Sequence, residues 1–475
     1  MHKVLQGDAK EMLKTLPDNS IDSCVTDPPY ELGFMGKKWD KSGITFDVGM
    51  WRECYRVLKP GGYLLSFGGC RTYHRIAVAI EDAGFIIHPM IAWVFGSGFP
   101  KATNLSKQLD KRRIGNNFDE IRDYLRNEWK RSGKTQKYLK EAMNDLTPGG
   151  GRISHYFGVE QAQVPNWEDW LVLKKELGLD NRYDELLIEH EREVVGKKIS
   201  GGADAWNNGL KNKEGEQKYT GQSEWDITTP ATPAAKQWDG WYYGLQSLKP
   251  ALEPICMAQK PPEGRVTDNV LKWGTGGLNI DGCRVGTNGA RFNGRNVDSD
   301  ICGKYGTSKP KEDYNKGRFP ANVIHDGSEE VLDEFAKAGE RTSGMMNPKQ
   351  QRKASKGKGG YHGNFPDTAT ESGTYGDSGT AARFFYCAKA SKAERGEGNN
   401  HPTVKPIKLM EYLIKLVTPP EGTILDPFVG SGTTLLAAEM LGRNSIGIED
   451  DLEYVKLIDK RMSNMQVNIF NFFTP

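Results

Sequence analysis

Four residues near the start of the chain have the types and spacing to hold an amine. Asp27, Pro28, Pro29 and Tyr30 directly follow Ile21–Thr26, an apolar run that we predict to be a strand. Asp27 offers a carboxylate acceptor, the prolines stiffen the backbone and hold its carbonyls outward, and Tyr30 offers a face on which a base can stack. Two acceptors gripping an aromatic amine would aim its nitrogen lone pair at an electrophile. Taken alone, the residues fit a plain turn after a strand equally well.

A glycine-rich turn near the other end has the composition of a ligand-binding loop. It follows the strand-like run Thr423–Leu425, precedes a predicted helix and reads Asp426, Pro427, Phe428, Val429, Gly430, Ser431, Gly432, Thr433. It is neither a Walker loop nor a G-x-G-x-x-G turn. Glu449 follows after the next predicted strand, at about the 20-residue spacing of an acid that binds ribose hydroxyls. The pattern favours a ligand with a carboxylate and an adenine ring, and tight packing of the loop is the alternative.

A third polar segment, His401–Pro406, lies just before the predicted helix Lys408–Val417 and contains Thr403 and Lys405. Its prolines stiffen the backbone. A simple linker before a helix explains it as well as a site does.

The elements that must position these residues occur at both ends of the chain. Strand and helix patterns alternate over residues 1–108 and again over 384–475, which is typical of an α/β fold with a mostly parallel sheet. Neither end is long enough for a complete domain, whereas together they are. We therefore predict that they form one Rossmann-like sheet around a large inserted middle, with an inserted helical segment at 109–195 and a loop-rich segment at 196–383.

Composition narrows the function class only a little. The 475 residues have a net charge of +2, so any surface that binds nucleic acid must be local. No apolar run has the length of a membrane helix, and no export signal is evident at the N-terminus. The seven cysteines include no CxxC pair, so we expect no metal site and a cytoplasmic protein with reduced thiols.

Taken together, the three segments resemble the permuted β-type amino DNA methyltransferases, which modify adenine N6 or cytosine N4. In that family a D-P-P-Y motif lies near the N-terminus, the D-P-F-x-G-S-G-T-T motif lies near the C-terminus, and target recognition lies between. Three further sequence segments, which begin at Arg56, Gly96 and Gly274, resemble the phage and mobile-element branch of this family. The resemblance makes 1–108 and 384–475 the two halves of the methyltransferase domain and 196–383 the target recognition region.

The resemblance implies S-adenosyl-L-methionine as cofactor and a flipped base in double-stranded DNA as substrate. Asp27 and the Pro28 carbonyl would grip the amine, with Tyr30 stacked on the base. The residues implied for the cofactor are Asp8, Thr403, Lys405, Asp426, Pro427, Phe428, Gly430, Ser431, Gly432, Thr433 and Glu449. Asp rather than Ser at position 27 favours adenine. Cytosine N4 and a catalytically inactive DNA-binding relative stay open, as does a homodimer, and we find no motif of a fused nuclease.

The inserted helical segment carries a second, looser resemblance. Residues 135–142 and 151–157 are similar to a repressor-like helix-turn-helix, which would put Arg152, Ser154 and His155 near DNA. A helical spacer is the alternative. The basic stretch around Lys353 and Lys356 could contact phosphates, with a solvated loop as the alternative.

Overall fold

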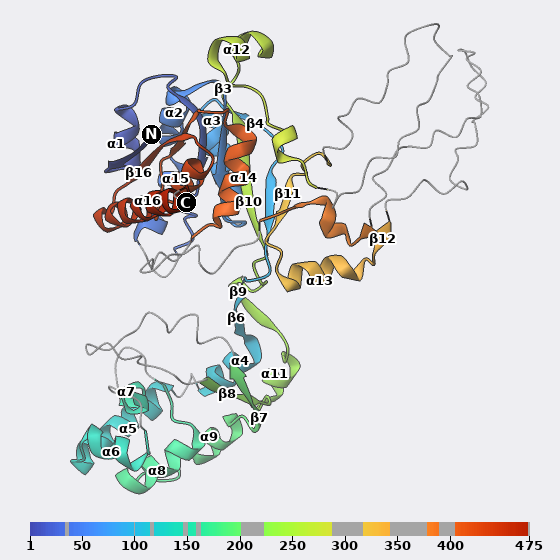
Figure 1. Cartoon of the computed structure of the whole chain (residues 1–475). Helices are drawn as coiled ribbons and strands as arrows, with labels where there is room; N and C mark the ends of the chain where they lie inside the picture. The colour runs from blue at the N-terminus through green and yellow to red at the C-terminus, as the bar shows by residue number, and fades with distance from the viewer. Residues whose placement is uncertain are drawn as a thin grey trace. The chain divides into compact units, whose positions relative to one another are not determined.

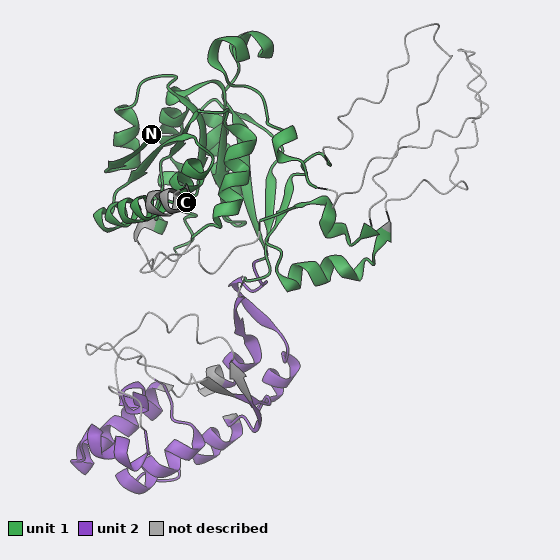
Figure 2. Ribbon diagram, in the orientation of Figure 1, with its two compact units in different colours: residues 1–98, 251–475 green, residues 99–250 purple. Residues whose placement is uncertain are grey.

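The computed structural model describes residues 1–33, 38–98, 100–114, 118–145, 151–157, 163–200, 223–286, 317–342, 378–388 and 404–473. The chain divides into two compact units. Unit 1 comprises residues 1–98 and 251–475, and unit 2 comprises residues 99–250 (Figure 2). Each unit has its own hydrophobic core.

Unit 1 contains a large sheet with helices packed against it (Figure 1). In chain order its main elements are β1 (His2–Gln6), α1 (Ala9–Lys14), β2 (Ile21–Thr26), α2 (Val48–Val57), β3 (Leu58–Phe67), α3 (Tyr73–Asp82), β4 (Ile86–Ile87), β5 (Ile91–Val94), β10 (Leu252–Gln259), α12 (Val266–Trp273), β11 (Val323–His325), α13 (Glu329–Lys337), β12 (Arg341–Thr342), β13 (Ser378–Gly379), β14 (Tyr386–Cys387), α14 (Ile407–Val417), β15 (Thr423–Asp426), α15 (Thr433–Met440), β16 (Asn444–Glu449) and α16 (Leu452–Phe473).

The two ends of the chain form one sheet, as predicted. The strand order is β1-β16-β15-β2-β3-β10-β5-β11-β14, with β4 also paired to β10. N-terminal strand β1 is parallel to C-terminal β16, and β15 is parallel to β2. The C-terminal strands β16 and β15 therefore lie between the N-terminal strands β1 and β2. The predicted α/β class with a mostly parallel sheet is confirmed.

Strand β10 departs from the predicted division of the chain. It lies between β3 and β5 and runs antiparallel to both. The sequence analysis placed these residues in the 196–383 segment, outside the two halves of the catalytic domain. Its buried run Pro254–Gln259 fills the centre of the sheet, so unit 1 resumes at residue 251 and not at 384, and its first part ends at 98 and not at 108.

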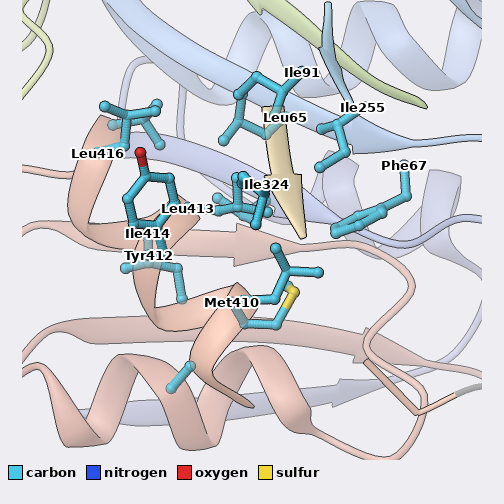
Figure 3. Close-up of a cluster of buried hydrophobic side chains, with 14 of the residues drawn as sticks. Leu65, Phe67, Ile91, Ile255, Ile324, Met410, Tyr412, Leu413, Ile414 and Leu416 are labelled. Carbon is cyan, nitrogen blue, oxygen red and sulfur yellow. The ribbon is translucent and has the colours of Figure 1, made fainter. Parts of the chain in front are cut away.

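Alternation along the central strands builds a core on each face of the sheet. Val25 and Leu65 face one side, and their chain neighbours Cys24 and Leu64 face the other, because successive side chains of a strand point to opposite faces. Helices α14 and α15 supply the first core and α1, α2 and α3 the second. Figure 3 shows the α14 part of the first core, in which Met410, Leu413 and Ile414 meet sheet residues.

Unit 2 consists of helices and two short antiparallel ribbons. Its elements are β6 (Lys101–Asn104), α4 (Leu105–Ile114), α5 (Phe118–Ser132), α6 (Gln136–Ala142), α7 (Gly151–Phe157), α8 (Trp167–Leu177), α9 (Asp184–His190), β7 (Val194–Ser200), β8 (Ser223–Thr228), α11 (Pro233–Gln237) and β9 (Tyr242–Gln246). Ile121 and Leu125, which lie four residues apart on α5, are buried in its core.

Two segments have more strand structure than their composition suggests. Residues 59–62 contain Pro and Gly, which favour a turn, but they belong to β3, where Gly61 N–H donates to the Lys260 carbonyl and pairing with a neighbouring segment overrides that preference. The segment 196–383, predicted to be loop-rich, contains β8, α11 and most of β7, which pairs with β8. Polar strands of an exposed ribbon give no apolar alternation by which to recognise them.

Candidate active site

The site lies where four neighbouring parallel strands end. Strands β15 and β16 end at Asp426 and Glu449, and Gly7 and Asp27 directly follow β1 and β2. Carboxyl ends of parallel strands meet at one edge of the sheet, the usual place for a ligand crevice. A cavity of about 750 Å³ opens there and is lined by both the Asp27–Tyr30 segment and the 426–434 loop.

Side-chain hydroxyls hold the backbone of the Asp27–Tyr30 segment in place. Thr45 Oγ1 donates to the Pro29 carbonyl at 2.7 Å, and Thr72 Oγ1 donates to the Tyr30 carbonyl at 2.7 Å. No donor from the described residues reaches the Pro28 carbonyl. Of these three carbonyls, that of Pro28 thus keeps its acceptor capacity for a ligand.

A charged cluster surrounds the Asp27 carboxylate. Lys405 Nζ lies 2.7 Å from Asp27 Oδ2 and 3.2 Å from Glu253 Oε2. The Tyr30 hydroxyl lies 2.9 Å from Asp27 Oδ1 and 3.1 Å from Glu253 Oε2. The cluster joins β2, β10 and the segment before α14, which are far apart in the sequence.

Burial and charge act together on this cluster. Burial, and then the nearby Asp27 and Glu253 carboxylates, raise the pKa of Tyr30 well above its ordinary value, so its phenol stays protonated. For Lys405, burial acts to lower the pKa, but the Asp27 and Glu253 charges outweigh it and the pKa is raised. The ammonium is therefore a permanent charge at neutral pH.

Asp426 holds the cofactor-side loop to the sheet. Its Oδ1 accepts from Thr26 Oγ1 at 2.6 Å and from Phe428 N–H at 3.1 Å, and its Oδ2 accepts from Thr434 Oγ1 at 2.5 Å. Burial raises its pKa to about 6, against the lowering effect of these hydrogen bonds. Although it lines the cavity, its carboxylate already binds protein donors, so its main visible role is to shape the loop.

The two glycines of the loop have different tasks. Gly430 has a φ of 52° and its N–H donates to Glu449 Oε2 at 2.9 Å. Gly432 has a φ of 85°, and a Cβ there would lie 3.0 Å from Ile458 Cγ1. Gly430 lines the cavity, and Gly432 has a conformational role against α16. The contact of Gly432 with a ligand stays a prediction.

Glu449 presents a carboxylate at the end of β16. Besides Gly430 N–H, it accepts from Asp451 N–H at 3.1 Å. Burial first, and then the neighbouring Asp450, raise its pKa to about 7. Each of its two oxygens thus accepts from one backbone N–H, and Glu449 lines the cavity. This arrangement suits the carboxylate to accept from hydroxyl groups of a ligand.

The remaining predicted cofactor residues divide into three groups. Asp8, Pro427, Phe428, Ser431 and Thr433 line the cavity, and Asp8 also caps α1 by accepting from Glu11 N–H. Lys405 lines the cavity too, but its ammonium contacts Asp27. Thr403 lies outside the described residues.

The sequence analysis missed Glu253. It belongs to the segment that was treated as target recognition, and nothing in its neighbourhood resembles a motif. The usable signal was an acid at the start of a buried apolar run, Glu253 before Pro254–Ala258. Such a run predicts a central strand, whose end can reach a site at the sheet edge.

The predicted DNA contacts are placed only in part. Arg152 donates to both carboxylate oxygens of the buried Asp169, at 2.8 and 2.9 Å, and to the Met143 carbonyl. Ser154 Oγ donates to the Gly151 carbonyl within α7. The helices predicted there are present, but Arg152 has an internal role, so its contact with DNA stays a prediction, as does that of His155. Lys353 and Lys356 lie outside the described residues.

In the ranges that the structure describes, no cluster of His, Cys, Asp or Glu side chains could hold a metal ion. No helix in these ranges is long and apolar enough to cross a bilayer.

This chain is similar to known proteins, some over a short segment and others over most of its length. Type II methyltransferase M2.LlaDCHI of Lactococcus lactis subsp. cremoris is 47% identical over 72 residues, which are 15% of this chain and 26% of that protein. Putative methylase YubD of Escherichia coli K12 is 42% identical over 95 residues, 18% of this chain and 40% of that protein. The chain thus spans about a quarter to two fifths of the length of these relatives.

A solved structure, PvuII DNA methyltransferase (cytosine-N4-specific), aligns with 96% of this chain and 85% of its own at 12% identity and a TM-score of 0.37. The family model described as DNA methylase matches residues 21–460, which include the Asp27–Tyr30 segment, the 426–434 loop and the insertion between them. The chain therefore belongs to the DNA methylase family.

Proposed function

We propose that this chain transfers a methyl group from S-adenosyl-L-methionine to the N6 amine of an adenine flipped out of double-stranded DNA. The observation that carries the proposal is the shared cavity: an amine-gripping segment and a glycine loop line one space of about 750 Å³. Family membership supplies the class of reaction. The identity of the base rests on Asp27.

The cofactor-side residues fit this cofactor. The positive φ of Gly430 turns the loop so that its backbone faces the cavity, and the Glu449 carboxylate lies beside it to accept from ribose hydroxyls. Phe428 supplies an aromatic wall. When bound, the cofactor supplies a methyl group on a positively charged sulfur.

The opposite wall orients the amine. Asp27 and the Pro28 carbonyl accept its two N–H groups, which leaves the nitrogen lone pair directed across the cavity. Flipping the base costs roughly a few kcal/mol, and stacking on the Tyr30 ring returns about 1–3 kcal/mol. These residues act through position and charge, and the rate follows from geometry held before reaction.

The test is methyl transfer by the whole chain. Purified protein is incubated with labelled cofactor and unmethylated duplex DNA, and the digested nucleosides are analysed by mass spectrometry. The proposal predicts N6-methyladenine. N4-methylcytosine alone would identify a cytosine-N4 methyltransferase instead. Cofactor binding without any transfer would indicate a catalytically inactive DNA-binding protein.

We further propose that the enzyme acts in the cytoplasm, and that it forms a homodimer. Sedimentation of the protein with and without a DNA duplex measures the assembly. A single species at the mass of one chain under both conditions would contradict a dimer.

A further inference from the structure

We propose that Lys405 and Glu253 are positioning residues that hold the Asp27 carboxylate in the orientation that accepts the target amine. The inference deepens the proposed function and rests on it. It gives Lys405 a role on the amine side of the cavity in place of the cofactor contact that the sequence resemblance implied.

The reversed direction of β10 brings Glu253 to the site. Because β10 is antiparallel to β3, its first residues lie at the edge where β3 and its parallel neighbour β2 end. Gly68 N–H donates to the Pro254 carbonyl at 3.0 Å and fixes that start. A parallel strand in the same place would present its other end there.

The donors and acceptors of the cluster match one another. An ammonium has three donors, and Lys405 Nζ has three oxygen neighbours: Asp27 Oδ2 at 2.7 Å, the Tyr30 hydroxyl at 3.1 Å and Glu253 Oε2 at 3.2 Å. The Lys405 side chain is only 8% exposed. Few of its donors are therefore left for a ligand.

These contacts fix the plane of the Asp27 carboxylate. Lys405 binds Oδ2 while the Tyr30 hydroxyl binds Oδ1, so the carboxylate cannot rotate without losing both. Each oxygen keeps a second lone pair, and an amine N–H can use one of them. Preorganised acceptors of this kind need no rearrangement when the substrate arrives.

The charges add a second constraint. Asp27, Glu253 and Lys405 carry −1, −1 and +1, a sum of −1 when all are ionised. Loss of the Lys405 charge leaves two carboxylates that share the Tyr30 hydroxyl, and like charges at this range repel. Removing Glu253 as well restores the sum of −1. A residue that only held the cofactor would show no such compensation.

The experiment compares Lys405→Met, Glu253→Gln and the double variant with wild type, using full-length protein. It measures kcat for DNA methylation at saturating substrates, the cofactor dissociation constant by calorimetry, and the melting temperature. The matched control is Lys408→Met with Glu411→Gln, which removes a Lys–Glu pair at 2.8 Å near the start of α14, away from the cavity.

We expect Lys405→Met to lower kcat about 100-fold, the size of effect of a displaced catalytic group, with less than about a 3-fold change in cofactor affinity. Glu253→Gln should lower kcat about 10-fold. The kcat of the double variant should be about 10-fold higher than that of Lys405→Met, because the effects of substitutions at contacting residues are coupled. The Lys408 and Glu411 control should keep wild-type kcat.

Three results would overturn the inference while wild type is active: an unchanged kcat in Lys405→Met, a fall in cofactor affinity as large as the fall in kcat, or a double variant no faster than Lys405→Met. If Lys405→Met does not fold, Glu253→Gln alone decides, and a wild-type kcat for it refutes the inference. An inactive wild type would instead refute the proposed function itself.

Discussion

The two walls of the cavity hold their carboxylates in different ways. On the amine side, the Asp27 carboxylate contacts an ammonium, that of Lys405. On the cofactor side, hydroxyls and a backbone N–H donate to the Asp426 carboxylate, and backbone N–H groups donate to that of Glu449, which also lies beside the Asp450 carboxyl. Burial accordingly raises the pKa of Asp426 to about 6 and that of Glu449 to about 7. The amine-side wall thus places a cation beside its carboxylate, and the carboxyls of the cofactor-side wall can change their charge between pH 6 and pH 7.

The largest effect that tests this contrast is on stability. Asp426→Ala leaves Thr26, Thr434 and the Phe428 N–H without their buried acceptor. We expect the free energy of unfolding to fall by about 3 kcal/mol in urea denaturation. Asp426→Asn, which keeps an acceptor and adds no charge, should cost about 1 kcal/mol.

A second prediction concerns how the difference in stability between wild type and Asp426→Asn depends on pH. Because the folded pKa of Asp426 is raised, the folded state binds its proton more tightly than the unfolded state. Wild type should therefore lose stability relative to Asp426→Asn as the pH rises from 4 to 6. A constant difference over that range would contradict a burial-raised pKa.

An intermediate effect is expected at the loop glycine. Gly432→Ala places a Cβ 3.0 Å from Ile458 Cγ1 at a φ of 85°. We expect a loss of about 1–2 kcal/mol in stability and a cofactor affinity reduced about 10-fold, because the loop must shift to admit the methyl group. Gly442→Ala, which shares a positive φ but meets nothing within 4 Å, is the control for backbone strain alone.

The smallest effect concerns Glu449 and pH. Its carboxyl has a pKa of about 7, and only the ionised form is a full acceptor for ribose hydroxyls. Cofactor affinity should rise several-fold from pH 6 to pH 8 and then level off. Glu449→Gln should bind more weakly with a flat profile, so a pH-dependent profile in that variant would assign the titration to another group.

The sequence was sufficient for the parts of the site that local patterns encode. Strand, acid and prolines at 21–30, and strand and glycines at 423–432, each depend on neighbours in the chain, and the structure brings both to one cavity. That the two ends of the chain share one sheet also followed, because neither end could complete a sheet alone, and the pairing of β1 with β16 is one such contact.

Contacts between residues that are far apart in the chain could not be predicted from the sequence. The position of Glu253 depends on β10 inserting antiparallel between β3 and β5, and a short apolar run does not state its direction or partners. The contact of Lys405 with Asp27 joins residues 378 positions apart. The internal pairing of Arg152 with Asp169 was missed for the same reason.

The role of the Asp27 carboxylate is tested most directly by labelled methyl transfer to duplex DNA with the Asp27→Ala variant. Cofactor binding by the same variant is measured by calorimetry. Asp82→Ala, which removes an exposed carboxylate at the end of α3, is the control. We predict that Asp27→Ala loses at least about 1000-fold in transfer while it binds the cofactor with near wild-type affinity, and that Asp82→Ala behaves as wild type. Transfer by Asp27→Ala at a near wild-type rate would contradict the central role given to the Asp27 carboxylate.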